Sequence, residues 1–203
     1  RIDLSSNGNR LIFSCNDNGN FQSEIEVYEI SGGNWIQLGN TILTLNNPDF
    51  NISNSNRGVK ISDDGNTLAV GSGDAGRIEI YHLTSNSWIL TGELQGIFEA
   101  NQGEFNTFCI SGDGNKVAFS NNDYSSSGEI KAYEYNGNSW SQYGQTIIMN
   151  ETILGSSISI NSSGTILAVG APFHSLDGNT SPGLVRIFEF KNGGWIQKGA
   201  DII

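Results

Sequence analysis

Residues 59–92 read VKISDDGNTLAVGSGDAGRIEIYHLTSNSWILTG and contain one complete structural unit. The short run VKI leads into the turn SDDG, a second apolar run LAV follows, and a third run, RIEIY, alternates in polarity. The unit closes on Trp88, with Gly92 four residues later. Glycine suits the turn because a tight hairpin needs a residue with positive φ. Short alternating runs separated by turn residues predict antiparallel β-strands.

The same unit occurs four times along the 203 residues. Its tryptophans are Trp35, Trp88, Trp140 and Trp195, each followed four residues later by glycine, and its strand-connecting turns end at glycines that include Gly65, Gly114 and Gly164. No stretch keeps a helical period over three turns. A repeat of roughly 50 residues with four short strands predicts an all-β fold, a β-propeller of four blades in a single domain, 1–203. The repeats span approximately 1–42, 58–94, 106–147 and 155–203.

The regular spacing of the tryptophans favours packing over ligand binding. Each indole is expected to lie against the glycine-containing outer strand or the neighbouring blade, where its large apolar ring is shielded from water. The chain starts with Arg1 at a first strand and stops at a fourth strand, so no strand is left to complete a blade from the opposite terminus. Two arrangements therefore stay open, a closed ring of four blades and a part of a longer propeller.

The segment Leu154–Pro172, LGSSISINSSGTILAVGAP, resembles the FG-GAP repeat of integrin-α-like propellers, with Leu-Gly in place of Phe-Gly and an intact Gly-Ala-Pro. The other three repeats depart from this pattern. The resemblance implies a calcium loop rich in aspartate between the second and third strands. The nearest spacing here places Asn16 and Asn18 as candidate ligands, but it lacks the several charged oxygens that calcium needs. The sequence thus predicts no metal or other cofactor.

Charge and hydropathy exclude two classes of partner. A formal net charge of −11 and an isoelectric point near 4.4 disfavour nucleic acid, because phosphate binding needs clustered Lys and Arg. The chain has no run of 18 apolar residues, so no membrane insertion is predicted. Cys15 and Cys109 fall in non-adjacent repeats and are not expected to pair.

The loops between the second and third strands vary in length, and so do the links between repeats, whereas the other turns are short and uniform. Binding residues concentrate on variable loops of a rigid scaffold. The candidate ligand-binding residues on this face are Phe105, Tyr124, Phe173, His174 and Asp177. The competing interpretation is that the phenylalanines fill small cores at the base of the loops.

The sequence contains few candidates for a catalytic site. His82 replaces a glutamate of the sister repeats and is expected at the surface, and His174 lacks the partners of a zinc site. The sequence therefore predicts a protein that is not an enzyme. Its expected role is recognition or adhesion on an extracellular, cell or particle surface, with a glycan or protein partner. Two alternatives remain: a structural component of a larger assembly, such as a virion or surface layer, and a propeller glycoside hydrolase whose carboxylates converge at the central channel.

Overall fold

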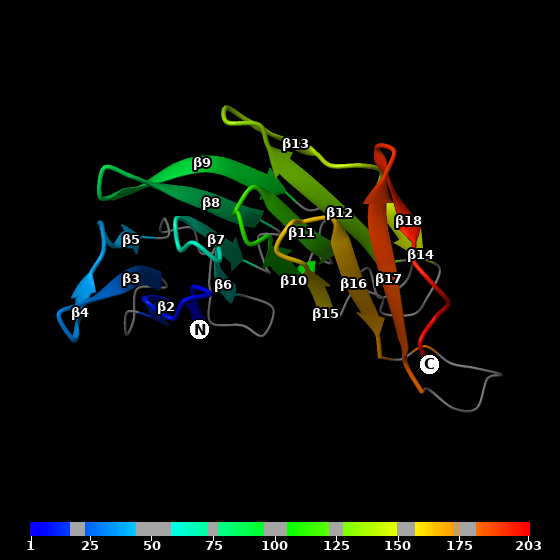
Figure 1. The fold of residues 1–203 in the computed structure, drawn as a ribbon, viewed down its shortest axis with the longest axis horizontal. Coiled ribbons are helices and arrows are strands. Elements are labelled where there is room, and N and C mark those ends of the chain that lie inside the picture. The colour runs from blue at the N-terminus through cyan, green and yellow to red at the C-terminus, as the bar shows by residue number, and fades with distance from the viewer. Residues whose placement is uncertain are drawn as a thin grey trace.

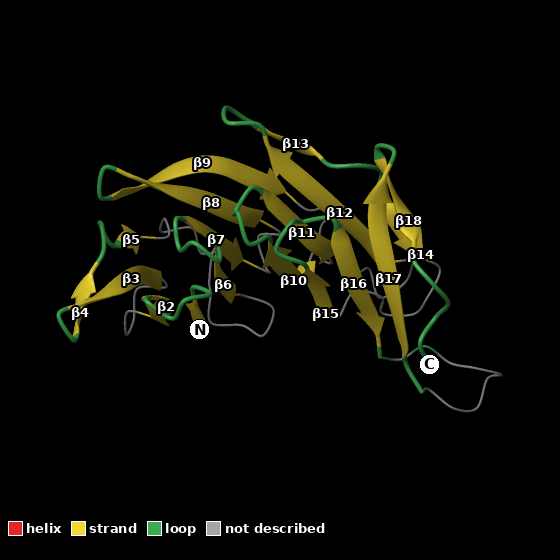
Figure 2. Cartoon of the chain, in the orientation of Figure 1, coloured by secondary structure: helices red, strands yellow, loops and turns green. Residues whose placement is uncertain are grey.

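The computed structural model describes residues 1–16, 23–43, 58–72, 77–95, 105–121, 128–149, 157–172, 174 and 182–203. Within these ranges every regular element is a β-strand (Figure 2). The strands form four antiparallel sheets, and we call each sheet a blade. Successive blades follow one another along an arc, with blade 1 and blade 4 at opposite ends (Figure 1).

Each blade consists of four strands in sequential order. Blade 1 contains β1 (Ile2–Leu4), β2 (Arg10–Asn16), β3 (Ser23–Ser31) and β4 (Asn34–Gln37); blade 2 contains β6 (Gly58–Ile61), β7 (Thr67–Ser72), β8 (Arg77–Thr84) and β9 (Ser87–Gln95). Blade 3 contains β10 (Phe105–Ile110), β11 (Lys116–Asn121), β12 (Gly128–Tyr135) and β13 (Trp140–Gln142); blade 4 contains β15 (Ser157–Ile160), β16 (Ile166–Ala171), β17 (Leu184–Lys191) and β18 (Gly194–Gln197).

The outer strand of a blade is interrupted in three of the four cases. After β4, Gly39 has a φ of +78° and the chain then returns to the same sheet as β5 (Ile42–Leu43), which pairs with β3. Blade 3 repeats this with Gly144 and β14 (Ile147–Met149), and in blade 4 Gly199 precedes a single bridge from Ile202 to Val185. In blade 2, β9 instead runs on to Gln95, with a bulge where its register against β8 shifts. A positive φ is accessible to glycine at little cost, which explains the conserved spacing within the repeats.

The turn between the first two strands is held by its own side chains. In blade 2 the Ser62 hydroxyl donates to Asp64 Oδ1 at 2.6 Å, and the same carboxylate oxygen accepts the backbone N–H of Asn66 at 2.9 Å. Gly65 follows with a φ of +73°, and Gly114 and Gly164 occupy the equivalent place with φ of +70° and +68°. Short polar side chains that bond to nearby backbone favour such turns over any continuing strand.

These turns also join the blades near the inner strands. Backbone N–H groups donate from Ser6 to Asp63 O, from Asp63 to Gly112 O and from Gly112 to Ser162 O, at 2.8–3.0 Å. Across Gly112 the Ser162 hydroxyl donates to Asp63 Oδ2 at 2.6 Å, and a Cβ on Gly112 would collide with both side chains. These hydrogen bonds link the four blades in sequence. A glycine is required at Gly112 of blade 3, because Asp63 of blade 2 and Ser162 of blade 4 meet across it.

The hydrophobic core lies between consecutive blades. One cluster joins blades 1 and 2 through side chains such as Ile12, Val27, Ile61 and Leu68, and two similar clusters join blades 2 and 3 and blades 3 and 4. Because blade 2 is covered on both faces, Leu68, Ala69 and Val70 are all fully buried in its second strand. Sheets that pack face to face in this way bury apolar area on both sides of an inner blade.

The structure also places charged and sulfur-containing side chains. The charged positions of the third strands form ion pairs, among them Glu79 with Arg77 at 2.6 Å and Arg186 with Asp201 at 2.7 Å. Cys15 is exposed and Cys109 is buried, and both thiols are free. No helix in the described ranges is long and apolar enough to cross a membrane.

Candidate functional site

Consecutive blades meet through a tryptophan seated on a glycine. Trp88 of blade 2 lies over Gly39 of blade 1, where a Cβ would come within 2.8 Å of the ring atom Cδ1. Its indole nitrogen donates to the carbonyl of Leu38 at 2.9 Å, and the residue is only 4% exposed. The contact recurs between blades 3 and 4, where Trp195 lies on Gly144 and donates to Tyr143 O at 2.9 Å. The Trp-x-x-x-Gly spacing therefore encodes the junction of two blades, because the glycine of one blade receives the tryptophan of the next.

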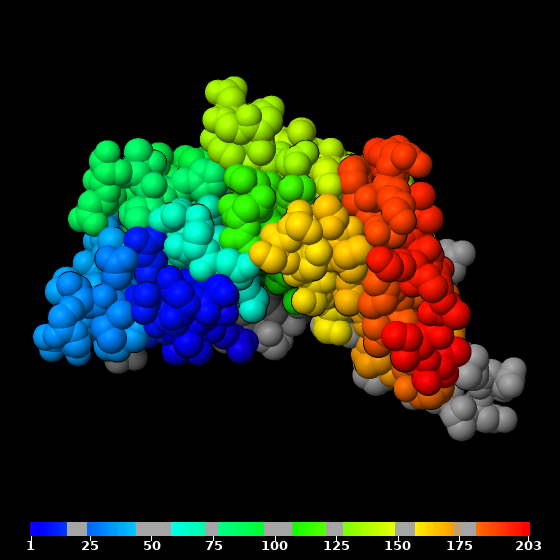
Figure 3. Space-filling view, viewed as in Figure 1, coloured from blue at the N-terminus to red at the C-terminus, as the bar shows by residue number. Residues whose placement is uncertain are grey.

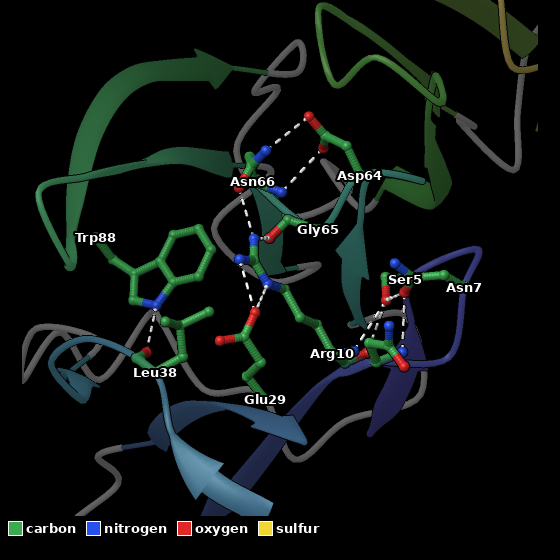
Figure 4. A network of polar contacts seen from close by, with 10 residues as sticks. Ser5, Asn7, Arg10, Glu29, Leu38, Asp64, Gly65, Asn66 and Trp88 are labelled. Carbon is green, nitrogen blue, oxygen red and sulfur yellow. Dashed lines mark hydrogen bonds and ion pairs between the residues drawn. The ribbon is translucent and has the colours of Figure 1, made fainter. Parts of the chain in front are cut away.

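A second contact fills the same junctions from the side of the short turns. Arg10, at the start of β2, lies over Gly65 of blade 2 and forms an ion pair with Glu29 at 2.8 Å (Figure 4). Its guanidinium also donates to the Gly65 carbonyl at 3.0 Å and to the side-chain oxygen of Asn66. The arginine thus connects two strands of its own blade with the turn of the next blade.

The junction of blades 3 and 4 is built in the same way. Lys116, at the start of β11, covers Gly164 of blade 4 and pairs with Glu134 at 3.2 Å. In both junctions a long cation and a glutamate face each other in the register of the second and third strands. The aliphatic part of the cation fills the space above the glycine, and its charged end stays close to solvent.

The junction of blades 2 and 3 departs from this pattern. The register of β7 and β8 pairs Thr67 with His82, where the other two junctions hold the cation and the glutamate. Thr67 reaches Gly114 but is too short to extend beyond it. The space left by the missing ion pair is a pocket of about 610 Å³. It is lined by Asn66, Thr67, His82, Leu83, Thr84, Asn115, Tyr135, Asn136 and Gly137.

His82 and Tyr135 are the titratable side chains that line this pocket. Burial lowers the pKa of the His82 imidazole, and the opposing attraction of the Asp64 carboxylate is the smaller effect. The ring stands edge-on to Tyr135, with centroids 4.8 Å apart. Its Nε2 is buried and has no hydrogen-bond partner among the described residues. A neutral imidazole in a cleft is a proton acceptor near neutral pH.

The same junction leaves a second nitrogen without a partner. Trp140 lies on Gly92 as the repeat requires, yet its buried Nε1 finds no acceptor in the described part of the chain. The carbonyl expected to accept it belongs to Thr91, three residues after Trp88. Thr91 is the bulged residue of β9, since Ile80 pairs with Gly92 and Tyr81 pairs with Leu90. The uninterrupted outer strand of blade 2 therefore turns that carbonyl away from its role in the other junctions.

The predicted ligand-binding residues are not assembled into a site by the described structure. Phe105 begins β10, but its side chain lies outside the described set, as do Tyr124, Phe173 and Asp177 entirely. His174 is half-buried; its N–H donates to Ala171 O at 3.2 Å, and its carbonyl accepts from Gly183 at 3.4 Å. The calcium candidate Asn18 is not described, and neither is the side chain of Asn16. In the ranges that are described, no three His, Cys, Asp or Glu side chains gather closely enough to hold a metal ion.

Two expectations differ from the structure. Trp35 was expected to pack like the other tryptophans but is 45% exposed, because no blade among the described residues lies against it on that side. His82 was expected at the surface but is half-buried and borders the pocket. The signal that could have found the pocket was present in the repeats, because the second repeat replaces both members of the cation–glutamate pair at once.

Comparison with known proteins establishes the fold. A putative 6-phosphogluconolactonase from Bacteroides fragilis matches all of this chain with a TM-score of 0.64 at 14% identity. The periplasmic gluconolactonase of Pseudomonas aeruginosa matches 99% with a TM-score of 0.60 at 12% identity, and the β-propeller domain of Swd1 from Myceliophteria thermophila matches 94% with a TM-score of 0.56 at 13% identity. The fold is a β-propeller.

The chain spans about half the length of these structures, 54%, 53% and 50% respectively. Its four sheets form an open arc, which agrees with part of a propeller and not with a closed ring of four blades. No family model matches the sequence, and no curated protein matches it.

The comparisons also correct the predicted function. The sequence predicted a non-enzymatic recognition or adhesion module, whereas two of these structural neighbours are named as lactonases, which are enzymes. The prediction is contradicted by these neighbours, and the third alternative, a propeller hydrolase, is closer to them. At 12–14% identity the likeness itself shows the fold alone.

Proposed function

We propose that this chain contributes to a propeller hydrolase that opens the ring of a small sugar lactone in the pocket beside Thr67 and His82. The observation that carries the proposal is the replacement of the cation–glutamate pair by threonine and a neutral histidine at one blade junction only of the three described. That exchange both opens the pocket and places a proton acceptor on its wall. The lactonase names of two structural neighbours supply the substrate class.

His82 is suited to general base catalysis. In the proposed reaction its imidazole takes a proton from a water molecule as the water oxygen forms a bond to the lactone carbonyl carbon. The ring C–O bond of the resulting tetrahedral species then breaks, and the departing alkoxide oxygen takes up the proton. Net, one water is consumed and one hydroxy acid is formed. A positioned base of this kind contributes roughly 10²–10⁴-fold to the rate.

The pocket also offers hydrogen-bond acceptors to a polyhydroxylated ligand. In the junction of blades 1 and 2, Arg10 donates to the Gly65 carbonyl and to the Asn66 side chain. In the repeat, Gly114 and Asn115 take the places of Gly65 and Asn66; Asn115 lines the pocket, and Thr67 brings no cationic group to it. Sugar hydroxyls can donate in its place, and buried acceptors are stabilised when they are satisfied.

The names of the neighbours give two substrate types, a sugar lactone with and without a phosphate group, and the charge of the chain favours one of them. A chain with a net charge of −11 repels a phosphorylated sugar, and long cations are missing from this pocket. We therefore expect gluconolactone to be preferred over its 6-phospho derivative, with a preference that weakens as salt screens the charge.

The test is a continuous assay of acid release from gluconolactone in weak buffer, with spontaneous hydrolysis subtracted. We expect the chain to accelerate the reaction and His82→Gln to abolish the acceleration. His174→Gln is the matched control, since it removes the only other histidine and lies outside the pocket. Because the pKa of His82 is lowered, activity should persist below pH 6.5, the ordinary pKa of histidine, before protonation removes the base. A chain that gives no rate above the buffer blank sinks the proposal.

A further inference from the structure

The pocket between blades 2 and 3 lies where the other two junctions hold a cation. These two blades are neighbours in the middle of the arc (Figure 3), and together they supply all the residues that line the pocket. In the junctions on either side, a long cationic side chain covers the turn glycine of the next blade, Arg10 over Gly65 and Lys116 over Gly164. Of the three junctions that the structure describes, this one alone lacks that cation.

Thr67 supplies only the first atoms of the missing side chain. A Cβ on Gly65 would meet Cβ and Cγ of Arg10 at 3.3 Å, and a Cβ on Gly114 would collide with Cβ and Oγ1 of Thr67. Thr67 therefore starts along the path of Arg10 but ends where the arginine continues to its guanidinium. The pocket of about 610 Å³ is the space left beyond it.

Two hydrogen-bond partners of the Arg10 guanidinium have counterparts on the pocket wall. Asn66 Oδ1 accepts from Arg10 (Figure 4), and Asn115, at the same place in the next repeat, lines the pocket. His82 holds the register position of Glu29, the carboxylate that pairs with Arg10. A neutral imidazole has one nitrogen that accepts a hydrogen bond, so the acceptor function is retained although the charge is lost.

An aromatic ring in the pocket favours a planar cation. In the junction of blades 3 and 4, the Lys116 ammonium lies 5.4 Å from the centre of the Tyr143 ring. Tyr135 lines the pocket between blades 2 and 3 and stands edge-on to His82. A guanidinium is flat and weakly hydrated, so it stacks on such a ring more readily than an ammonium does.

The electrostatic field of the chain also favours a cation at this place. Arg10 helps to lower the pKa of Asp64, and the same carboxylate opposes the lowering of the His82 pKa, so Asp64 acts on both junctions of blade 2. A net charge of −11 attracts cations from solution.

We propose that the pocket binds the guanidinium group of a ligand, in the place that Arg10 fills between blades 1 and 2. Its N–H groups would donate to Asn115 and to the neutral His82, with its plane against Tyr135. This binding requires no hydrolysis, and a bound guanidinium would exclude the lactone of the proposed function.

An NMR titration of the isotope-labelled chain with ethylguanidinium tests the proposal, with ethylurea as the neutral probe of the same shape. We expect saturable shifts at His82, Asn115 and Tyr135 with a dissociation constant of about 1–10 mM, the range for a ligand of so few atoms. Ethylurea should bind about tenfold more weakly, because hydrogen bonds from a charged donor are the stronger ones. Equal binding of the two probes, or shifts that do not saturate, overturns the proposal.

A blocked tripeptide, acetyl-Gly-Arg-Gly-amide, is titrated in parallel to find the source of the guanidinium. Binding about tenfold tighter than that of ethylguanidinium would assign the pocket to an arginine side chain of a peptide. Equal or weaker binding would assign it to a small molecule.

Variants separate the pocket from general effects. The double variant Thr67→Arg with His82→Glu rebuilds the ion pair of the other junctions, so it should lose ethylguanidinium binding and unfold at higher urea. Asn115→Ala should weaken binding about tenfold, whereas Asn9→Ala, the same repeat position in blade 1 and outside the pocket, should not. Unchanged binding in the double variant or in Asn115→Ala would refute the assigned place.

The outcome also distinguishes this binding from the proposed reaction. Ethylguanidinium that binds a chain without lactonase activity removes the proposed hydrolysis alone. Lactone hydrolysis that ethylguanidinium does not inhibit competitively overturns the guanidinium site alone.

Discussion

The repeated tryptophans should respond differently to the same substitution, because their indole nitrogens have different partners. Trp88→Phe removes the hydrogen bond from Nε1 to the Leu38 carbonyl, and Trp140→Phe removes an Nε1 that is buried without a partner among the described residues. The perturbation is chemically identical in the two blades. The two environments differ in the bulge at Thr91 and in burial, since Trp88 is 4% exposed and Trp140 is half-buried.

The size of the difference follows from two contributions. For Trp88, which is 4% exposed, the loss of apolar volume equivalent to about two methylenes costs about 2 kcal/mol. The lost hydrogen bond adds about 1 kcal/mol. For the half-buried Trp140 the apolar loss is about 1 kcal/mol, and removal of an unsatisfied buried N–H returns about 1–3 kcal/mol. We expect Trp88→Phe to destabilise by about 3 kcal/mol and Trp140→Phe to be neutral or stabilising.

Equilibrium urea unfolding followed by far-UV circular dichroism measures this difference without relying on the altered fluorophores. Trp195→Phe is the internal replicate, since Trp195 is 4% exposed and donates to Tyr143 O as Trp88 does to Leu38 O. The midpoints should fall for Trp88→Phe and Trp195→Phe with unchanged slopes. A Trp140→Phe variant that loses as much stability as Trp88→Phe would refute the account of the bulge.

Three further outcomes are expected. Glu79→Ala should destabilise by about 3–5 kcal/mol in urea unfolding, because it removes a buried partner of Arg77 and of the Tyr81 hydroxyl. Glu93→Ala, which removes the more exposed of the two carboxylates that pair with Arg77, should cost under about 1 kcal/mol. Burial opposes ionisation of Asp64 and Asp113, but hydrogen bonds from Ser62 and Ser111 and from nearby backbone hold the pKa of each carboxyl below its usual range. The two carboxylates therefore contribute to the free energy of unfolding above the unfolded pKa near 3.9, and this contribution is lost as the pH falls below it. In the double variant Asp64→Asn with Asp113→Asn, the free energy of unfolding should fall less steeply at acid pH. An unchanged acid dependence would contradict this. Ellman's reagent should titrate the exposed Cys15 in the folded chain but Cys109 only after unfolding, because burial raises the pKa of Cys109 to about 12 and encloses it; a Cys15→Ser chain with a fast thiol would be inconsistent with that burial.

Local patterns in the sequence are enough to predict the strand order and the turns. Period-two runs separated by glycine turns admit few folds, and a unit that cannot bury both of its faces alone must stack against copies of itself. The role of Gly65 follows from the same local chemistry, since Ser62 and Asp64 hydrogen-bond within a few residues of it. Such interactions depend on neighbours along the chain and can be read without coordinates.

The pocket and the open ends were decided by tertiary structure. The sequence contains the exchange of a cation and a glutamate for Thr67 and His82, but only the register of β7 against β8 shows that the two exchanges face each other. Likewise, Trp35 and Trp88 stand in the same local pattern, yet one is exposed and the other buried, because exposure depends on which blade lies alongside. A repeat specifies its own strands through local contacts, whereas sites between repeats arise from pairs of residues about fifty positions apart, whose meeting only the packed fold establishes.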